Sequence, residues 1–407
     1  MNSLRVAIYH NLHSGGAKRV LMEHARRLAT RHRVSLFSLS SADHTFANDD
    51  RSQVPVSLLD YHRLPMARSP FGRINPIVGM LNVMRLDALS RQLATLIDGQ
   101  SFDVVLVHPC QVTQAPLLLR WLRTPTLYYC HELPRKLYES PVARPYLSRS
   151  HLRRSLDSVD PLPVCINTWL RRLDRQSAQR ATRIVTNSHF SQNNVVAAYG
   201  RPADICYPCV DADVFQPTWA DREPFVLSVG ALTPAKGFDF VIQALGTLSA
   251  SERPRLVIIS NYQESEELRY LTALAQQQQV EAEFHTGVTE PELRAWYARA
   301  GCVAYAPIRE PLGLVALETM AAGAPLVCVA EGGLAETVVH TVTGVLVPRE
   351  PVIFGQAIRQ LLAQPEYARQ LGQAARRHVL EHWTWGYHME RLESILEQAA
   401  CRALPSG

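Results

Sequence analysis

Two carboxylates in the stretch REPLGLVALETMAAGAP have the type and spacing to take part in ligand chemistry. Glu310 and Glu318 stand eight residues apart, and Glu318 falls among apolar residues that a buried helix face would use. Burying a carboxylate without a partner is unfavourable, so an acid at this position implies that something binds to it. We interpret both acids as acceptors for polyol hydroxyls, with Glu318 suited to a ribose diol. The structural alternative is that Glu318 pairs with an arginine.

Backbone groups between the two acids are suited to holding an anion. Gly313 precedes the expected helix, and the first N–H groups of a helix have no partner within it. We therefore expect the N–H groups of Gly313, Leu314 and Val315 to form an anion site. Two carboxylates beside such a site fit a ligand that joins a sugar, a diphosphate and a nucleoside.

Two glycine-containing loops could approach phosphate groups. In HSGGAKRV, residues 13–20, Gly16 would let the backbone come close to a ligand. In SVGALTPAKGFDF, residues 228–240, Lys236 stands beside an expected helix start, where a compact cation suits diphosphate oxygens. Neither loop is a GxGxxG fingerprint or a Walker A sequence. Lysine is scarce, which makes Lys236 conspicuous: the chain has only Lys18, Lys136 and Lys236.

The elements that must position these residues alternate between strand and helix. Short apolar runs followed by helical patterns predict an α/β fold with doubly wound parallel sheets. The proline-containing residues 207–224 interrupt the pattern, so we expect two domains, 1–213 and 218–382. A helix over about 383–402 is expected to return to the first domain. The ligand cleft is expected between the domains, at the carboxyl ends of the strands.

Composition describes a globular protein whose charge is unevenly spread. The chain has 407 residues, 47% of them apolar and 19% charged, which suits two domains. Residues 1–216 carry 27 Lys and Arg against 16 Asp and Glu, whereas the remainder carries 15 against 21. The basic half could face phosphate groups, anionic lipid or nucleic acid, or be a solvated arginine-rich surface. Residues 61–80 and 134–165 fit no period and are expected to be loops, with a membrane-touching element as the alternative for the second.

The start of the chain and its cysteines bear on the compartment. MNSLRVAIYHNLHSGG lacks the apolar region and cleavage site of a signal peptide. No apolar run approaches the roughly 18 residues of a membrane span. Of eight cysteines, only Cys206 and Cys209 are close, without the further ligands of a zinc site. We expect a cytoplasmic protein with reduced thiols, and contact with the inner face of the membrane as an open alternative.

The second half of the chain resembles the retaining family 4 glycosyltransferases of the GT-B fold. The matching landmarks are VG-x-L-x-P-x-KG at 229–237, E-x7-E at 310–318, ETMAAGAPLV at 318–327 and GG-x-x-E at 332–336. Looser matches in the first half are GGA at 15–17, YYCHELP at 128–134, NSHFSQNNV at 187–195 and YPCVDADVF at 207–215. YYCHELP followed by NSHFS is similar to mannosyltransferases of lipid-linked oligosaccharide and polysaccharide assembly. The resemblance implies two Rossmann-like domains that face a cleft.

The resemblance also implies roles for individual residues. Lys236 would bind the diphosphate of a nucleotide sugar, Glu318 its ribose hydroxyls and Glu310 its hexose. His131 would line the sugar from the first domain, where Gly16 would let the backbone touch the phosphate. The catalytic residues would then be Glu310, His131 and Lys236. Further donor contacts would come from the N–H groups of Gly313, Leu314 and Val315, and from Gly287, Val288 and Thr289 near the base.

One position departs from the family pattern. The family usually has an arginine directly after the strand glycine, where this chain has Ala231. We expect Arg309 or Lys18 to supply the missing cation. The Asp-x-Asp sequence at 211–213 matches a metal-binding motif of another glycosyltransferase fold, but it lies in the linker. We interpret it as coincidence and expect no metal and no cofactor.

These observations predict a retaining, metal-independent glycosyltransferase. It would move a hexose, preferentially mannose from GDP-mannose, to a hydroxyl of a glycan or lipid-linked acceptor, as a peripheral membrane protein without a nucleic-acid partner. Three alternatives stay open: a transferase that uses a UDP-sugar, a nucleotide-sugar epimerase of the same fold, and a non-catalytic protein that binds nucleotide sugars.

Overall fold

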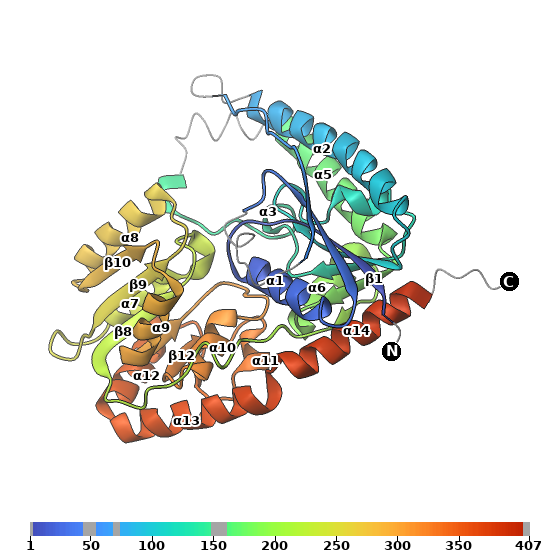
Figure 1. The fold of residues 1–407 in the computed structure, drawn as a ribbon. Coiled ribbons are helices and arrows are strands. Elements are labelled where there is room, and N and C mark those ends of the chain that lie inside the picture. The colour runs from blue at the N-terminus through green and yellow to red at the C-terminus, as the bar shows by residue number, and fades with distance from the viewer. Residues whose placement is uncertain (1–2, 44–53, 68–73, 148–160, 402–407) are drawn as a thin grey trace. The chain divides into compact units, whose positions relative to one another are not determined.

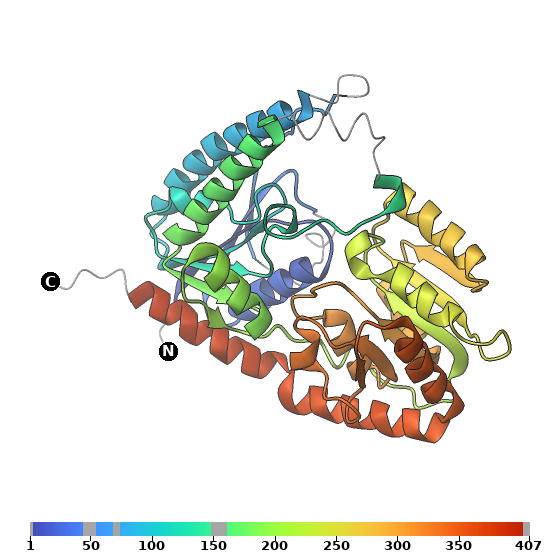
Figure 2. The same ribbon diagram turned by 180° about the vertical axis from the view of Figure 1, so that it is seen from behind.

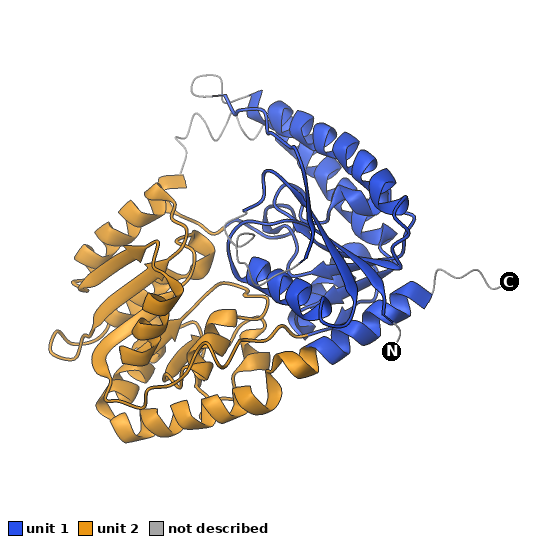
Figure 3. Ribbon diagram, in the orientation of Figure 1, with its two compact units in different colours: residues 1–141, 149–206, 389–407 blue, residues 142–148, 207–388 orange. Residues whose placement is uncertain are grey.

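The chain forms two compact units. The computed structural model describes residues 3–43, 54–67, 74–147 and 161–401. Unit 1 comprises residues 1–141, 149–206 and 389–407, and unit 2 comprises residues 142–148 and 207–388 (Figure 3).

Unit 1 is built on a parallel sheet whose central strands are buried on both faces. Its seven strands follow the order β3-β2-β1-β4-β5-β6-β7. Every residue of β4 is buried, which explains why this strand reads as an apolar run rather than an alternation. The strands are β1 (Arg5–Asn11), β2 (Arg33–Leu39), β3 (Val56–Leu59), β4 (Val104–Cys110), β5 (Thr126–Cys130), β6 (Arg183–Thr186) and β7 (Asp204–Ile205).

Helices flank both faces of this sheet (Figures 1 and 2). They are α1 (Gly16–Leu28), α2 (Asn75–Asp98), α3 (Arg135–Tyr138), α5 (Pro161–Arg180) and α6 (His189–Tyr199), with the short turn η2 (Leu117–Arg120). The prediction of irregular loops over 61–80 and 134–165 was wrong over the short helix α3, and also from Asn75 and Pro161 onward, where α2 and α5 begin. Both helices begin with proline in their first turn, where the missing N–H costs nothing.

Unit 2 repeats the architecture with a six-stranded parallel sheet in the order β10-β9-β8-β11-β12-β13. The order reverses direction between β8 and β11, so the loops after these strands lie side by side at the carboxyl edge. The strands are β8 (Glu223–Val229), β9 (Arg255–Ser260), β10 (Ala282–Thr286), β11 (Ala300–Tyr305), β12 (Leu326–Val329) and β13 (Val345–Val347). The helices are α7 (Phe238–Gly246), α8 (Ser265–Gln277), α9 (Glu290–Arg299), α10 (Leu314–Ala321), α11 (Leu334–Thr337), α12 (Pro351–Ala363) and α13 (Pro365–His382), with the turns η3 (Pro145–Leu147) and η4 (Pro234–Lys236).

The units divide between residues 206 and 207, earlier than the boundary expected at 213–218. Packing explains the difference. The Tyr207 hydroxyl donates to Glu336 at 2.8 Å, and Phe215 packs edge-on against Tyr297 with ring centroids 5.9 Å apart. The first part of the expected linker is therefore held by the core of unit 2.

The last helix of the described chain, α14 (Trp385–Cys401), contributes to both units, with residues from 389 onward in unit 1. There Glu393 pairs with Arg31 at 3.0 Å, and Gln398 accepts from Arg183 at 2.5 Å. None of the helices in the described ranges is long and apolar enough to cross a membrane. All eight cysteines are free thiols, including the close pair Cys206 and Cys209.

Candidate functional site

The reversal of strand order in unit 2 brings Lys236 and Glu310 together. Lys236 ends the turn η4 that follows β8, and Glu310 lies in the loop that follows β11. The Lys236 Nζ atom lies 2.8 Å from Glu310 Oε2, and the two side chains are 25% and 13% exposed. The Ile308 N–H donates to the Ala235 carbonyl at 2.8 Å, so the two loops are also joined through their backbones. A lysine and a carboxylate that keep partial access to solvent can exchange partners with an anionic, hydroxyl-rich ligand.

Glycines allow three loops to approach one another here. Gly237 has φ 67°, and a Cβ at that position would lie 2.0 Å from the Ala306 carbonyl oxygen. Gly332 has φ 60°, and its Cβ would lie 2.4 Å from the Glu310 carbonyl oxygen. The Gly333 N–H donates to that same oxygen at 2.8 Å. The glycine pair at 332–333 therefore fixes the backbone of Glu310. This contact explains why the chain has two glycines at these positions after the E-x7-E motif.

Glu318 is buried in α10, only 2% exposed, and accepts a hydrogen bond from a tyrosine. Tyr297 Oη donates to Glu318 Oε2 at 2.9 Å. Gly313, with φ 95°, is the N-cap of α10. The hydrogen bonds of the first turn run from the N–H groups of Ala316 and Leu317 to the Gly313 carbonyl, so the N–H groups of Leu314 and Val315 precede them. Their role as an anion site stays a prediction.

Tyr305, the last residue of β11, is a buried neighbour of both acids. Burial raises the pKa of Tyr305 well above its ordinary value, and the charges of Glu310 and Glu318, with a hydrogen bond to Glu310, raise it further. The tyrosine therefore stays protonated and can donate to Glu310. Sequence reasoning missed Tyr305 and Tyr297, because a tyrosine at a strand end or inside a helix carries no motif.

The residues expected near the base lie at the end of β10. Gly287 has φ 70°, and its N–H donates to the carbonyl of Ser260, the last residue of β9, at 3.3 Å. Thr289 is the N-cap of α9 and forms a capping box with Glu292, whose Oε2 accepts from the Thr289 N–H at 2.8 Å. Thr289 thus has a local structural role. The base contact of Gly287, Val288 and Thr289 stays a prediction.

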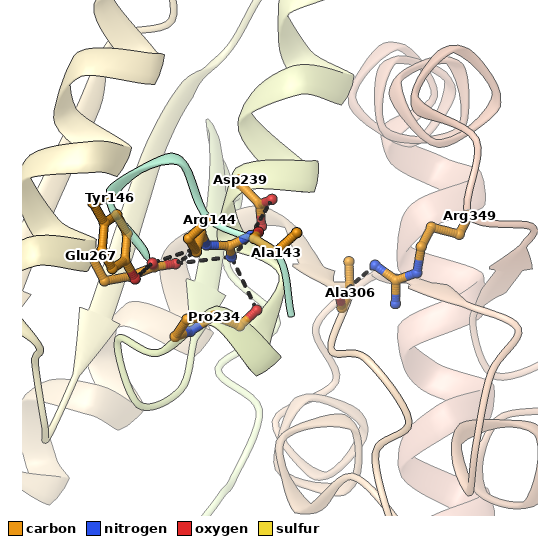
Figure 4. Close-up of polar contacts among 8 residues, drawn as sticks. All are labelled: Ala143, Arg144, Tyr146, Pro234, Asp239, Glu267, Ala306 and Arg349. Carbon is orange, nitrogen blue, oxygen red and sulfur yellow. Dashed lines mark hydrogen bonds and ion pairs between the residues drawn. The ribbon is translucent and has the colours of Figure 1, made fainter. Parts of the chain in front are cut away.

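Two arginines on or beside the loop that carries Glu310 differ in their contacts. Arg309 is exposed and has φ 49°, an uncommon conformation for a residue with a side chain. Arg349, which the sequence analysis did not consider, binds Glu331 at 2.7 Å. It also donates to the Ala306 carbonyl at 3.1 Å, as Figure 4 shows. Arg349 therefore braces the start of the loop that carries Glu310.

In unit 1, Gly16 is the first residue of α1 and Lys18 lies in its first turn. The Lys18 side chain is buried, and its Nζ lies 3.3 Å from His10 Nε2. Burial lowers the pKa of Lys18 to about 8, and the charge of Asp43 opposes this shift. Lys18 is therefore only partly protonated near pH 8, unlike an exposed lysine.

His131 follows β5 and begins a chain of buried imidazole rings. Its Nε2 lies 3.2 Å from His108 Nδ1, and His108 Nε2 lies 3.3 Å from His24 Nδ1. The Tyr129 ring lies 4.7 Å from the His131 ring, centroid to centroid. Each ring pair needs one N–H and one lone pair, so the tautomers of the three histidines are coupled. Sequence reasoning found only His131, because His24 lies within a helix and His108 within an apolar strand.

The Asp-x-Asp sequence at 211–213 forms a local turn, in which the Asp213 N–H donates to Asp211 Oδ1 at 3.1 Å. Among the residues described by the structure, no group of three or more His, Cys, Asp or Glu side chains is placed to hold a metal ion.

Comparison with known proteins identifies the family of both halves. The family model described as Glycosyltransferase Family 4 matches residues 14–214, and the model described as Glycosyl transferases group 1 matches residues 210–378. Together they span nearly the whole chain.

Two relatives and one solved structure agree with this. The chain is 24% identical to the alpha-1,3/1,6-mannosyltransferase ALG2 of Rhizomucor pusillus, over 97% of this chain and 91% of that protein. It is 31% identical to the GDP-mannose-dependent alpha-(1-6)-phosphatidylinositol monomannoside mannosyltransferase of Mycobacterium tuberculosis, over 51% of this chain and 60% of that protein. The crystal structure of Anabaena Alr3699/HepE in complex with UDP-glucose has a TM-score of 0.70 and 17% identity, covering 97% of this chain and 100% of that one, and shows the shared fold.

With two parallel Rossmann-like sheets, matches to both domain models and mannosyltransferases among its relatives, the chain belongs to the family 4 glycosyltransferases of the GT-B fold.

Proposed function

We propose that this glycosyltransferase moves mannose from GDP-mannose to a hydroxyl of a glycan or lipid-linked acceptor, with retention and without a metal ion. The observation that carries the proposal is the pairing of Lys236 with Glu310 at 2.8 Å, where the strand order of unit 2 reverses. The choice of mannose is supported by relatives named as mannosyltransferases, one of them GDP-mannose-dependent.

The geometry of unit 2 suits each part of a nucleotide sugar. Lys236 and the N–H groups at the start of α10 would hold the diphosphate, and Glu318 would accept from the ribose hydroxyls. Glu310 would give up its contact with Lys236 and accept hydrogen bonds from hydroxyls of the hexose instead. A cation and fixed N–H dipoles at the leaving diphosphate stabilise the charge that develops there in the transition state.

Retention follows if donor and acceptor oxygens share one face of the sugar. In the proposed step, the bond from the anomeric carbon to the diphosphate oxygen breaks while the bond to the acceptor oxygen forms. The acceptor hydroxyl gives its proton to the leaving phosphate, so no enzymic nucleophile is needed. His131 would line the sugar during this step, and its coupling to His108 would keep the ring in one orientation.

The donor is tested by thermal shift against a panel of nucleotide sugars. We expect GDP-mannose to raise the melting temperature more than GDP-glucose, UDP-glucose or UDP-N-acetylglucosamine, because a ligand that binds only the folded state stabilises it by mass action. A shift with a UDP-sugar and none with GDP-mannose would show that the preference for GDP-mannose is wrong while leaving the transferase assignment intact.

The role of Glu318 is tested by Glu318→Gln, with Tyr297→Phe as the matched control. Glutamine keeps the shape but loses the charge, and we expect donor affinity by calorimetry to fall about tenfold or more, the size of a hydrogen bond to a charged group. Tyr297→Phe removes the hydroxyl that donates to Glu318 and should lower the free energy of unfolding by about 1 kcal/mol. Equal effects of both variants on donor affinity would make Glu318 a core acid rather than a ligand contact.

The cation that replaces the missing arginine is tested by Lys18→Met and Arg309→Ala. Losing it should lower kcat/KM by about 100-fold, corresponding to ~3 kcal/mol of transition-state stabilisation. If the cation is Lys18, its lowered pKa predicts that kcat/KM falls as pH rises through about 8, with His10 and Asp43 as its titratable neighbours. If it is Arg309, that pH limb is absent. Unchanged rates in both variants would remove the idea.

Membrane contact would be made by α2, whose outer face is unusually apolar. Ile77, Leu81 and Met84 are 41%, 42% and 55% exposed and share one helical face. Arg85 and Arg91 are exposed on the two sides of this stripe. An apolar stripe flanked by arginines suits shallow insertion into a membrane that contains anionic lipid.

We expect the protein to sediment with phosphatidylglycerol-containing vesicles and the double variant Leu81→Glu, Met84→Glu to lose at least about fivefold of the bound fraction, since two charges would have to enter the lipid interface. Leu380→Glu, at another exposed leucine, serves as the control and should bind like wild type. Equal sedimentation of all three proteins would exclude α2 as the contact.

A further inference from the structure

A short segment of the chain places a buried arginine against the loop that carries Lys236. Residues 142–148 group with unit 2, although the residues on both sides of them belong to unit 1. Arg144 lies in this segment, and its side chain is only 3% exposed. The sequence analysis expected an irregular loop here, with membrane contact as the alternative. Arg144 and Tyr146 instead pack within unit 2, and residues 148–160 lie outside the described chain.

The guanidinium of Arg144 is surrounded by acceptors (Figure 4). Its Nε lies 3.1 and 3.0 Å from the two carboxylate oxygens of Glu267. Nη1 and Nη2 each lie 3.0 Å from one carboxylate oxygen of Asp239, a bidentate pair. Nη2 also donates to the Pro234 carbonyl at 3.1 Å, and Nη1 to the Ala143 carbonyl at 3.2 Å.

Two of these partners stand on either side of Lys236 in the sequence. Pro234 begins the turn η4, which ends at Lys236, and Asp239 lies in the first turn of α7. Arg144 therefore holds both ends of the segment that presents the lysine. Between these two ends, the Ala235 carbonyl accepts from the Ile308 N–H at 2.8 Å. Contacts at Pro234, Ala235 and Asp239 therefore fix the segment.

Arg144 has no capacity left for a ligand. A guanidinium has five N–H donors, and the acceptors of Glu267, Asp239, Pro234 and Ala143 account for them. Any effect on a bound donor must therefore be transmitted through the loop. The ion pair also neutralises Asp239, whose negative charge would otherwise oppose an anion at the N-terminus of α7.

We propose that Arg144 is a positioning residue for the donor diphosphate: it fixes the turn 234–236 and the start of α7 so that Lys236 meets the phosphates. The inference rests on the proposed role of Lys236 in donor binding. The competing explanation is that Arg144 only anchors its own segment to unit 2.

Because the chain has only three lysines, the surroundings of Lys236 can be followed directly by NMR. Reductive methylation with 13C-formaldehyde labels at most three lysines besides the N-terminal amine, and loss of one NMR signal in Lys236→Arg assigns Lys236. The signal is recorded for the free protein and in separate titrations with GDP-mannose and UDP-glucose. Arg144→Met keeps the aliphatic part of the side chain and removes the guanidinium group. Tyr146→Phe is the matched control, because Tyr146 donates to Glu267 from the same segment without touching the turn.

We expect Arg144→Met to move the Lys236 signal in the free protein and to weaken the affinity of the donor that binds wild type by about tenfold or more. Tyr146→Phe should leave the Lys236 signal in place and change affinity less than about twofold. Asp239→Asn weakens the contact of Arg144 with the start of α7 but leaves its ion pair with Glu267, and it should move the Lys236 signal in the same direction. This variant tests the proposal if Arg144→Met does not fold.

A folded Arg144→Met or Asp239→Asn protein with the wild-type Lys236 signal and wild-type donor affinity would overturn the proposal. Its failure is distinguishable from failure of the proposed function. If neither nucleotide sugar moves the Lys236 signal in the wild-type protein, the donor role of Lys236 fails. The effect of Arg144 on the turn is still read from the free protein.

Discussion

The ion pair between Lys236 and Glu310 is the interaction on which the site of unit 2 depends. The two residues are 74 positions apart and meet only because β8 and β11 are adjacent where the strand order reverses. Both side chains are partly buried, so in the absence of a ligand each charge is stabilised by its ion pair with the other, which offsets the loss of hydration. The close approach of their loops requires glycine at positions 237 and 332, where any Cβ would overlap a carbonyl oxygen.

Local geometry, rather than net charge, is what would let unit 2 accept a polyanion. The second half of the sequence has more acidic than basic residues, 21 against 15 from residue 217 onward. Two arginines near the site are already paired: Arg349 with Glu331, and Arg144 with Asp239 and Glu267. The attraction for phosphate would then come from Lys236, from the proposed substitute cation and from backbone N–H groups, whose effect depends on exact direction and distance.

Repeating apolar runs and local motifs were sufficient to predict both parallel sheets and the glycine-containing loops that follow their strands, because strand periodicity and glycine spacing are properties of neighbouring residues. What the sequence did not reveal depends on contacts between distant positions. Arg144 binds residues 95 and 123 positions away, and His108 joins His24 across 84 positions. The helix α2 was missed because Ile77, Leu81 and Met84 are apolar yet exposed, which blurs the contrast between its faces.

Because position 231 is alanine, backbone N–H groups would have to supply more of the positive charge that faces the donor diphosphate. Without the arginine common in the family, Lys236 is opposed by Glu310, so this pair supplies little net positive charge. The helices α7 and α10 both begin at this edge, after Gly237 and Gly313, and the N-terminus of each carries about half a positive charge. This partial charge attracts phosphate only if the helix is correctly placed and no acid in its first turn cancels it. Arg144 meets both conditions for α7, because it positions the helix start and neutralises Asp239. In the proposed function, the buried polar contacts of Arg144 would therefore hold the start of α7 where it compensates in part for the missing arginine.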